Sequence, residues 1–234
     1  MIKTIRKQLM QLPYGDLFGF AKENGVINGF DYEVVDDMCV IVLTDKNGTV
    51  SKYKPSDRQY DFIVNEAISR LSAVPHILQF ANERYKPTQK VVWPKRKVSI
   101  IPGEMDDPFD FALAGIQEID GELGMAMYSI EVKCRENDKY TKEYFNKNGV
   151  MVDLQKQTKA TTLYTQSSDG YGFFFNMEDA VRTGQTITDK TTVGKTGEKV
   201  LKDRIYFNVS DAIAVYEPYE SKVIADYIKE NNAS

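Results

Sequence analysis

Apolar residues recur every three or four positions in the first part of the chain, the spacing that places side chains on one side of a helix. This spacing predicts an amphipathic helix over residues 2–12, a second short helix over Asp16–Glu23, and a longer helix that begins near Pro55. The apolar face of the first helix consists of Ile2, Ile5, Leu9 and Leu12. The apolar face of the longest helix consists of Tyr60, Ile63, Val64, Ala67, Ile68 and Leu71. Pro75 is expected either to kink this helix or to start a new one.

A β-hairpin is predicted between the second and third helices, over residues 38–54. Met38–Thr44 is a compact apolar run, and Thr49–Lys54 is a second strand-like run after it. Asn47-Gly48 lies between the two runs, and Asn-Gly is the strongest short hairpin signal because both residues tolerate positive φ.

Beyond Pro87 the apolar pattern changes to a period of two. In Met125–Cys134 apolar and polar residues alternate, which is typical of a half-buried strand in an antiparallel sheet. Further strands are expected at Lys90–Trp93, Lys97–Ile101, Val150–Leu154, Thr161–Thr165, Tyr171–Phe175 and Ile205–Val209. A helix over Pro108–Ile119 is expected to interrupt the strands, and a C-terminal helix is predicted from Val223, Ile224, Tyr227 and Ile228.

These patterns together predict an α+β fold. A mainly helical portion, residues 1–88, contains the hairpin 38–54, and a mainly antiparallel β-rich portion covers residues 89–234. The second portion includes a long polar hairpin arm at residues 183–203 and the C-terminal helix. One continuous domain fits the same pattern equally well.

The segment Thr183–Asp203 has few apolar residues and therefore little surface to bury. Its clearly apolar members are Ile187, Val193, Val200 and Leu201. Because ordering a segment costs conformational entropy, such an arm is expected to be held by something outside its own domain, and gripping a neighbouring subunit is a common use. A loose surface loop is the alternative. The residues predicted for an interface are Phe174, Ile187, Lys190, Val193, Lys195 and Lys199, with Phe174 included if its own domain leaves it uncovered.

Gly194-Lys195-Thr196 resembles the end of a phosphate-binding P-loop. That motif needs a glycine where Asp189 stands, an apolar strand before it and a helix after it. Here the preceding segment is mostly polar and the following one, Val200–Phe207, is strand-like. We therefore interpret Gly194 and Gly197 as turn residues of the arm.

Composition and charge narrow the possible functions. The net charge is -4 and the sequence pI about 5.3, so no overall basic field attracts nucleic acid or an anionic membrane. The single histidine, His76, excludes a multi-histidine metal site. Cys39 and Cys134 are expected to be buried free thiols. The sequence predicts neither a signal peptide nor a membrane span, and no cofactor.

Two charged clusters offer alternatives to a structural role. Glu104, Asp106, Asp107 and Asp110 would serve a metal-dependent enzyme, although acidic residues before Pro108 also suit the start of a helix. The basic segment 86–97, which surrounds Trp93, would serve a nucleic-acid-binding module or guard an exposed sheet edge. Neither cluster carries a catalytic motif.

The order of these parts resembles the head–tail connector and neck-ring proteins of tailed bacteriophages. The N-terminal helices with the Ile2/Ile5/Leu9/Leu12 face, followed by the β-rich portion with the Thr183–Asp203 arm, carry this resemblance. It implies a ring-forming, non-enzymatic virion subunit that is assembled in the host cytoplasm. Its expected partners are copies of itself and other structural subunits.

Overall fold

The computed structural model describes residues 4–84, 99–105, 107–119, 121–135, 137–153, 160–193 and 198–225. Its helices are α1 (Ile5–Leu9), α2 (Tyr14–Glu23), α3 (Arg58–Arg84), α4 (Lys142–Asn148) and α5 (Met177–Thr183), and residues 222–225 begin another helix near the C-terminus. Together with three sheets they form an α+β fold, as the sequence predicts.

The largest sheet has six strands in the order β12-β9-β8-β6-β5-β4. Its strands are β4 (Ser99–Pro102), β5 (Phe111–Ile119), β6 (Glu122–Cys134), β8 (Thr162–Gln166), β9 (Gly172–Asn176) and β12 (Ala214–Tyr216). Neighbouring strands run antiparallel except β6 and β8, which are parallel. Between these two parallel strands the chain passes through α4 and β7 (Val150–Asp153). This crossover places β7 in a second sheet, of order β10-β11-β7, with β10 (Gln185–Val193) and β11 (Glu198–Phe207).

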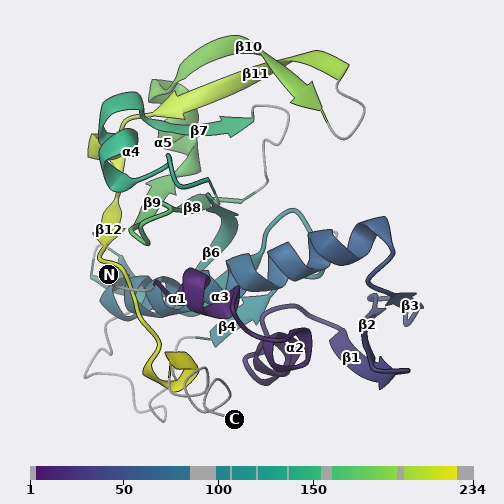
Figure 1. Ribbon diagram of the computed structural model, residues 1–234. Helices are drawn as coiled ribbons and strands as arrows, with labels where there is room; N and C mark the ends of the chain where they lie inside the picture. The colour runs from purple at the N-terminus through teal and green to yellow at the C-terminus, as the bar shows by residue number, and fades with distance from the viewer. Residues whose placement is uncertain are drawn as a thin grey trace.

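Strand β9 is buried on both of its faces, and this arrangement defines the layers of the molecule. Phe174 packs toward α3, where its ring stacks on Phe80 with centroids 4.3 Å apart. Phe173 and Phe175 point the opposite way, into a second hydrophobic cluster with Ile205 and Phe207 of β11. Helix α3 therefore covers one face of the six-stranded sheet, and the β10-β11-β7 sheet packs against the other (Figure 1).

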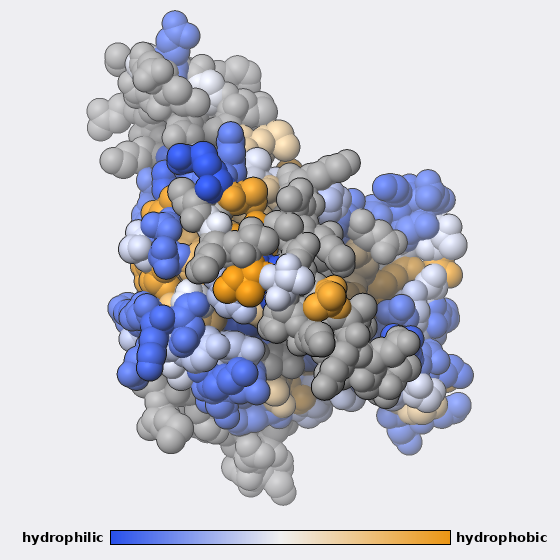
Figure 2. Space-filling model, turned by 90° about the horizontal axis from the view of Figure 1, so that it is seen from above, coloured by the Kyte–Doolittle hydropathy of each residue, from blue (hydrophilic) through white to orange (hydrophobic). Residues whose placement is uncertain are grey.

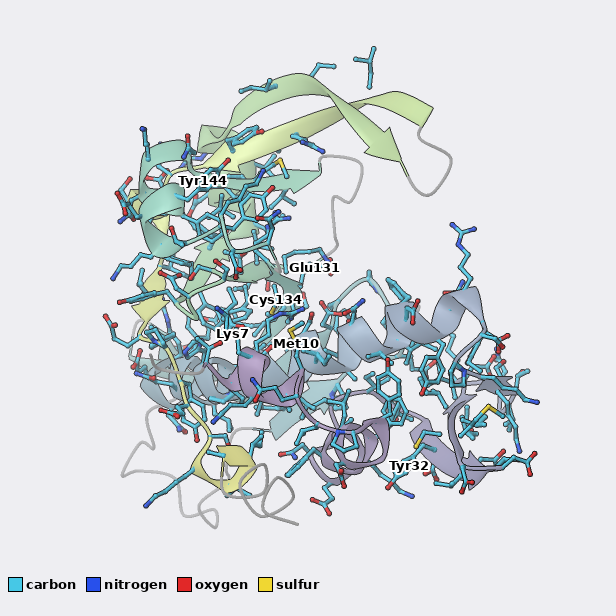
Figure 3. The ribbon with its side chains drawn as sticks, viewed as in Figure 1. Lys7, Met10, Tyr32, Glu131, Cys134 and Tyr144 are labelled. Carbon is cyan, nitrogen blue, oxygen red and sulfur yellow. The ribbon has the colours of Figure 1, made fainter. Side chains whose placement is uncertain are left out.

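The first hydrophobic cluster draws on both the helical and the β-rich portions of the chain. It extends from Ile5 in α1 to Ile224 near the C-terminus. The predicted face of α3 is buried, and the helix continues through Pro75 without ending there. At the N-terminus the Gln8 side chain makes two hydrogen bonds to the backbone of Ser221, at 3.2 and 2.9 Å. Near Cys134 of β6, side chains fill the space between this strand and α3 (Figure 3).

The predicted hairpin forms two strands of a three-stranded sheet. Strand β2 is Met38–Thr44, β3 is Val50–Tyr53, and Gly48 in the connecting turn has φ +80°. Strand β1 (Phe30–Val35), which the sequence pattern does not predict, pairs with β2 over its whole length. Its central residues, Asp31-Tyr32-Glu33, are half-buried and mostly polar, so the strand lacks the apolar run that identified β2.

The predicted helix over Pro108–Ile119 is wrong, because this segment forms β5. Phe111–Ile119 pairs with β6 along nine residues, from Phe111 opposite Ile130 to Ile119 opposite Glu122. As a strand paired with β6, this segment buries Phe111 and Leu113 fully on the α3 side. The segment therefore forms a strand despite the helix preference of Ala112 and Ala114. The predicted strand Lys90–Trp93 lies outside the described residues.

Candidate functional site

Arg70 of α3 organises the acidic residues near the core. Its side chain is almost fully buried and pairs with two carboxylates, Glu66 at 2.7 Å and Asp110 at 2.9 Å. Its Nη1 also donates to the backbone oxygen of Gly103, at 2.6 Å. Asp110 in turn accepts a hydrogen bond from the backbone N–H of Val132, at 2.6 Å. Asp110 is thereby fixed between α3 and β6 and acts as a structural anion.

The rest of the predicted acidic cluster shapes the turn before β5. The Asp107 carboxylate accepts from the backbone N–H of Glu104 at 2.9 Å, and Glu104 accepts from the backbone N–H of Lys46 at 3.1 Å. Asp106 lies outside the described residues, and Pro108 begins no helix for the cluster to stabilise. In the described part of the chain, no three His, Cys, Asp or Glu side chains are grouped as metal ligands would be.

His76 is a buried structural residue. Its Nε2 donates to the backbone oxygen of Glu217 at 2.8 Å, and its Nδ1 accepts from the Tyr164 hydroxyl at 2.8 Å. Burial lowers the pKa of His76, so the imidazole is neutral at physiological pH. These two hydrogen bonds tie α3 to the segment after β12 and to β8. The imidazole thus has a structural role here.

Both cysteines are free, as the sequence predicts, although each side chain is half-buried. Cys134 lies against α3, where its thiol donates to the backbone oxygen of Ser69 at 3.6 Å. Burial raises the pKa of the Cys134 thiol, which keeps it protonated and therefore a poor nucleophile.

The polar arm forms the predicted hairpin and extends past the sheet that supports its base. Strands β10 and β11 pair over nine residues, from Gln185 opposite Tyr206 to Val193 opposite Glu198. Strand β7 pairs with β11 only along residues 204–207. Beyond Arg204, the two strands of the arm pair with each other and with no other described strand (Figure 1). Because β11 is a strand that pairs with β10, the helix that a P-loop requires after its lysine is absent from residues 198–207.

One face of β11 is buried at the base of the arm and exposed farther along the arm. Phe207, Ile205 and Leu201 lie on the same side of the strand, since side chains alternate with a period of two. Phe207 is 2% exposed and Ile205 4%, whereas Leu201 is 61% exposed. On the opposite face of the ribbon, Ile187, which pairs with Arg204, is 41% exposed. The view from above, toward the side that carries the arm, shows apolar residues separated by polar ones (Figure 2).

The predicted interface residues fall into three groups. Phe174 does not belong to an interface, because α3 covers it completely. Ile187, Lys190 and Val193 lie on β10, and Lys199 lies opposite Thr192 on β11, so these four share the arm. Lys195 and the basic segment 86–97 lie outside the described residues.

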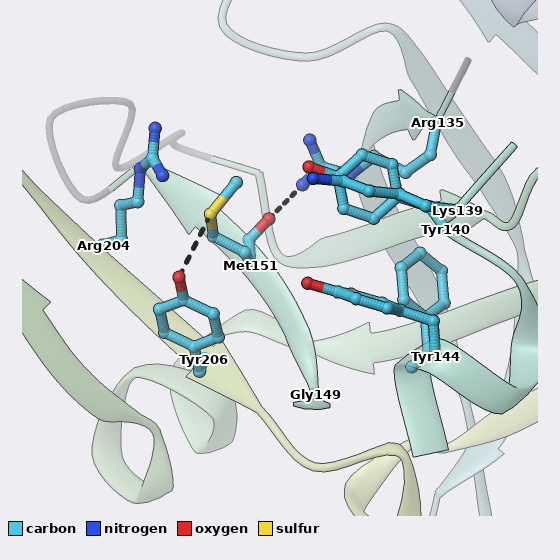
Figure 4. Close-up of a pocket in the computed structure, with 9 residues that line it drawn as sticks. Arg135, Lys139, Tyr140, Tyr144, Gly149, Met151, Arg204 and Tyr206 are labelled. Carbon is cyan, nitrogen blue, oxygen red and sulfur yellow. Dashed lines mark hydrogen bonds between the residues drawn. The ribbon is translucent and has the colours of Figure 1, made fainter. Parts of the chain in front are cut away.

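A pocket that the sequence analysis missed lies at the base of the arm. It has a volume of about 190 Å³ and is lined by Arg135, Lys139, Tyr140, Tyr144, Phe145, Gly149, Met151, Arg204 and Tyr206 (Figure 4). Three of these residues are cationic, three are tyrosines, and none is acidic. The concentration of basic and tyrosine residues between Arg135 and Tyr144 was a signal for it, but Arg204 and Tyr206 join them only through the pairing of β11 with β7.

No protein-family model matches the chain, and the comparisons with curated proteins and with solved structures give no match either. Among the described residues, no helix combines the length and the apolar character that crossing a bilayer requires.

Proposed function

We propose that this protein is a non-enzymatic structural subunit of a larger assembly and that its β10–β11 arm contacts a second copy of the chain or another structural subunit. The observation that carries this proposal is the exposure of Leu201 on the strand face that buries Ile205 and Phe207. Exposed apolar groups on an extended two-stranded ribbon gain stability when a partner covers them.

The backbone of the arm supports the same proposal. Strand β10 is at the edge of its three-stranded sheet, so one side of it has no neighbouring strand among those described. An open strand edge pairs readily with an extended segment of another chain. The arm thus offers a partner both backbone hydrogen bonds and apolar side chains. Within this proposal the connector resemblance assigns the subunit to the head–tail region of a phage virion.

Removing the arm tests the proposal. Residues 188–203 are replaced by Asn-Gly, which joins Ile187 and Arg204, two residues that already lie opposite each other in the hairpin. Analytical ultracentrifugation over a range of protein concentrations measures self-association, and thermal unfolding shows whether the body remains folded. We expect the variant to stay folded and to lose self-association.

A matched control shortens only the tip. Replacing residues 194–197 with Asn-Gly keeps both strands and Leu201, so this variant should associate as the unmodified protein does. Self-association of the arm-deleted protein at the unmodified level would contradict the proposal.

A further inference from the structure

The pocket at the base of the arm combines four parts of the fold. Arg135 and Lys139 come from the segment after β6, Tyr144 from α4, and Met151 from β7, while Arg204 and Tyr206 come from β11. In Figure 4 the Tyr144 ring extends toward Met151, and the Tyr206 hydroxyl points at Met151 from the other strand. Because each part belongs to an ordered element or follows one directly, the lining is positioned before any ligand arrives.

The charge of the lining favours an anionic ligand. Arg135, Lys139 and Arg204 all line the space, and none of the nine described lining residues is acidic. The Lys139 ammonium lies 4.8 Å from the centre of the Tyr140 ring and forms no ion pair with a described carboxylate. Arginine side chains bind phosphate with two parallel hydrogen bonds, and lysine binds it as a point charge.

The tyrosines contribute aromatic ring faces and hydroxyl groups to the lining of the pocket. Tyr140 and Tyr144 lie edge to face, with ring centroids 5.3 Å apart. The hydroxyl of Tyr206 donates to the Met151 sulfur at 3.4 Å, and a thioether sulfur is a weak acceptor. The Tyr144 hydroxyl donates to no other described residue. Both hydroxyls gain a stronger hydrogen bond when an oxyanion enters the pocket.

We propose that this pocket binds a small phosphate monoester in which the phosphate is attached to a ring-bearing group, as in a nucleoside monophosphate. The phosphate, with a charge near -2 and three acceptor oxygens, matches several cations and hydroxyl donors better than a carboxylate does. The ring packs against the tyrosines, since stacking on aromatic side chains tolerates different bases. A volume of about 190 Å³ is below the usual range for ligand pockets and limits the enclosed portion of such a ligand to the phosphate and part of the ring-bearing group. This proposal does not depend on the assembly function of the arm.

Isothermal titration calorimetry on the full chain tests the proposal, with uridine 5′-monophosphate as the probe beside uridine and inorganic phosphate. We expect the monophosphate to bind at least about tenfold more tightly than either fragment, because each fragment makes only part of the contacts. Raising the salt concentration should weaken binding of the monophosphate. A 5′-phosphorylated trinucleotide, titrated in parallel, distinguishes a free nucleotide from the end of a strand.

Two lysine substitutions locate the site. Lys139→Met removes an exposed cation of the pocket and should weaken monophosphate binding by about fivefold to tenfold, the value of an ordinary hydrogen bond, because solvent screens this exposed charge. Lys147→Met, on α4 but outside the pocket lining, should leave affinity unchanged. Three results overturn the proposal: no binding of the monophosphate, equal binding of uridine or of inorganic phosphate, or an equal loss for both variants. Circular dichroism confirms that each variant is folded before titration.

Discussion

Helix α3 and the β10–β11 arm are both long and continuous, but different interactions stabilise them. Along α3, one apolar face between Tyr60 and Ala81 is buried. Arg70 forms a buried ion pair with Asp110, just before β5, and His76 forms a hydrogen bond with the segment after β12. The outer part of the arm has its own antiparallel pairing, and Leu201 on it is 61% exposed. Burial of side chains stabilises the first element and backbone pairing the second.

This difference predicts where a substitution changes the stability of the molecule. A two-stranded ribbon without a buried face is marginally stable in water, so it contributes little to the folding of the body. A buried charged residue has the opposite property, because removing its partner leaves an uncompensated charge in a region of low dielectric. Substitutions on the buried face of α3 should therefore destabilise the whole fold, and substitutions in the outer part of the arm should not.

The largest effect is expected from Arg70→Ala. This change leaves the carboxylate of Asp110 buried without its cation, and it should lower the free energy of unfolding by about 3–5 kcal/mol. Urea denaturation at pH 7 measures the loss. Arg58→Ala, at the exposed start of the same helix, is the control and should change stability by less than about 0.5 kcal/mol. A loss below about 1 kcal/mol for Arg70→Ala would remove the distinction between helix and arm.

A smaller effect should appear as a pH dependence that originates at Glu66. Burial and the nearby negative charge of Asp110 raise the pKa of Glu66 to about 7, while Arg70 opposes the shift. The folded state then binds a proton more tightly than the unfolded state does. Stability from this group is fully present below the unfolded pKa, which is about 4.3, and is lost as pH rises toward the folded pKa.

The measurement compares the unmodified protein with Glu66→Gln in urea at pH 5 and at pH 8. Between these values the unmodified protein should lose about 1–3 kcal/mol more stability than the variant, because glutamine does not titrate and still accepts a hydrogen bond from Arg70. Parallel pH profiles for the two proteins would show that Glu66 is ionised in the folded state throughout, with Arg70 dominating its environment.

Local sequence patterns were sufficient to predict the elements whose buried residues recur at a regular spacing along the chain. The buried face of α3 follows from helical spacing alone, and β2 with its turn at Gly48 follows from one apolar run and one Asn-Gly pair. The alternation in β9 also accounts for the position of Phe174 on the face opposite Phe173 and Phe175. In each case the deciding neighbours are within a few residues in sequence.

Features that depend on distant pairing were not predictable in this way. Whether Phe174 is covered depends on the position of α3, nearly 100 residues earlier in the chain, so the local alternation does not decide its exposure. Residues 111–119 have enough alanine to resemble a helix, and pairing with β6 makes them a strand. The basic pocket needs Arg204 and Tyr206 beside Met151, a juxtaposition created by one strand pairing.

The smallest effect is expected at Leu201, in the outer part of the arm, and it tests the comparison within one strand. Leu201→Ala should change the free energy of unfolding by less than about 0.5 kcal/mol, because the leucine is already mostly in water. Phe207→Ala, six residues along the same strand, should cost about 3–5 kcal/mol because its ring is 2% exposed. Both are measured at low protein concentration, so that association does not add to stability. A cost of 2 kcal/mol or more for Leu201→Ala, on the order of a buried leucine, would mean that the arm packs against its own body and would leave no exposed apolar face for a partner to cover.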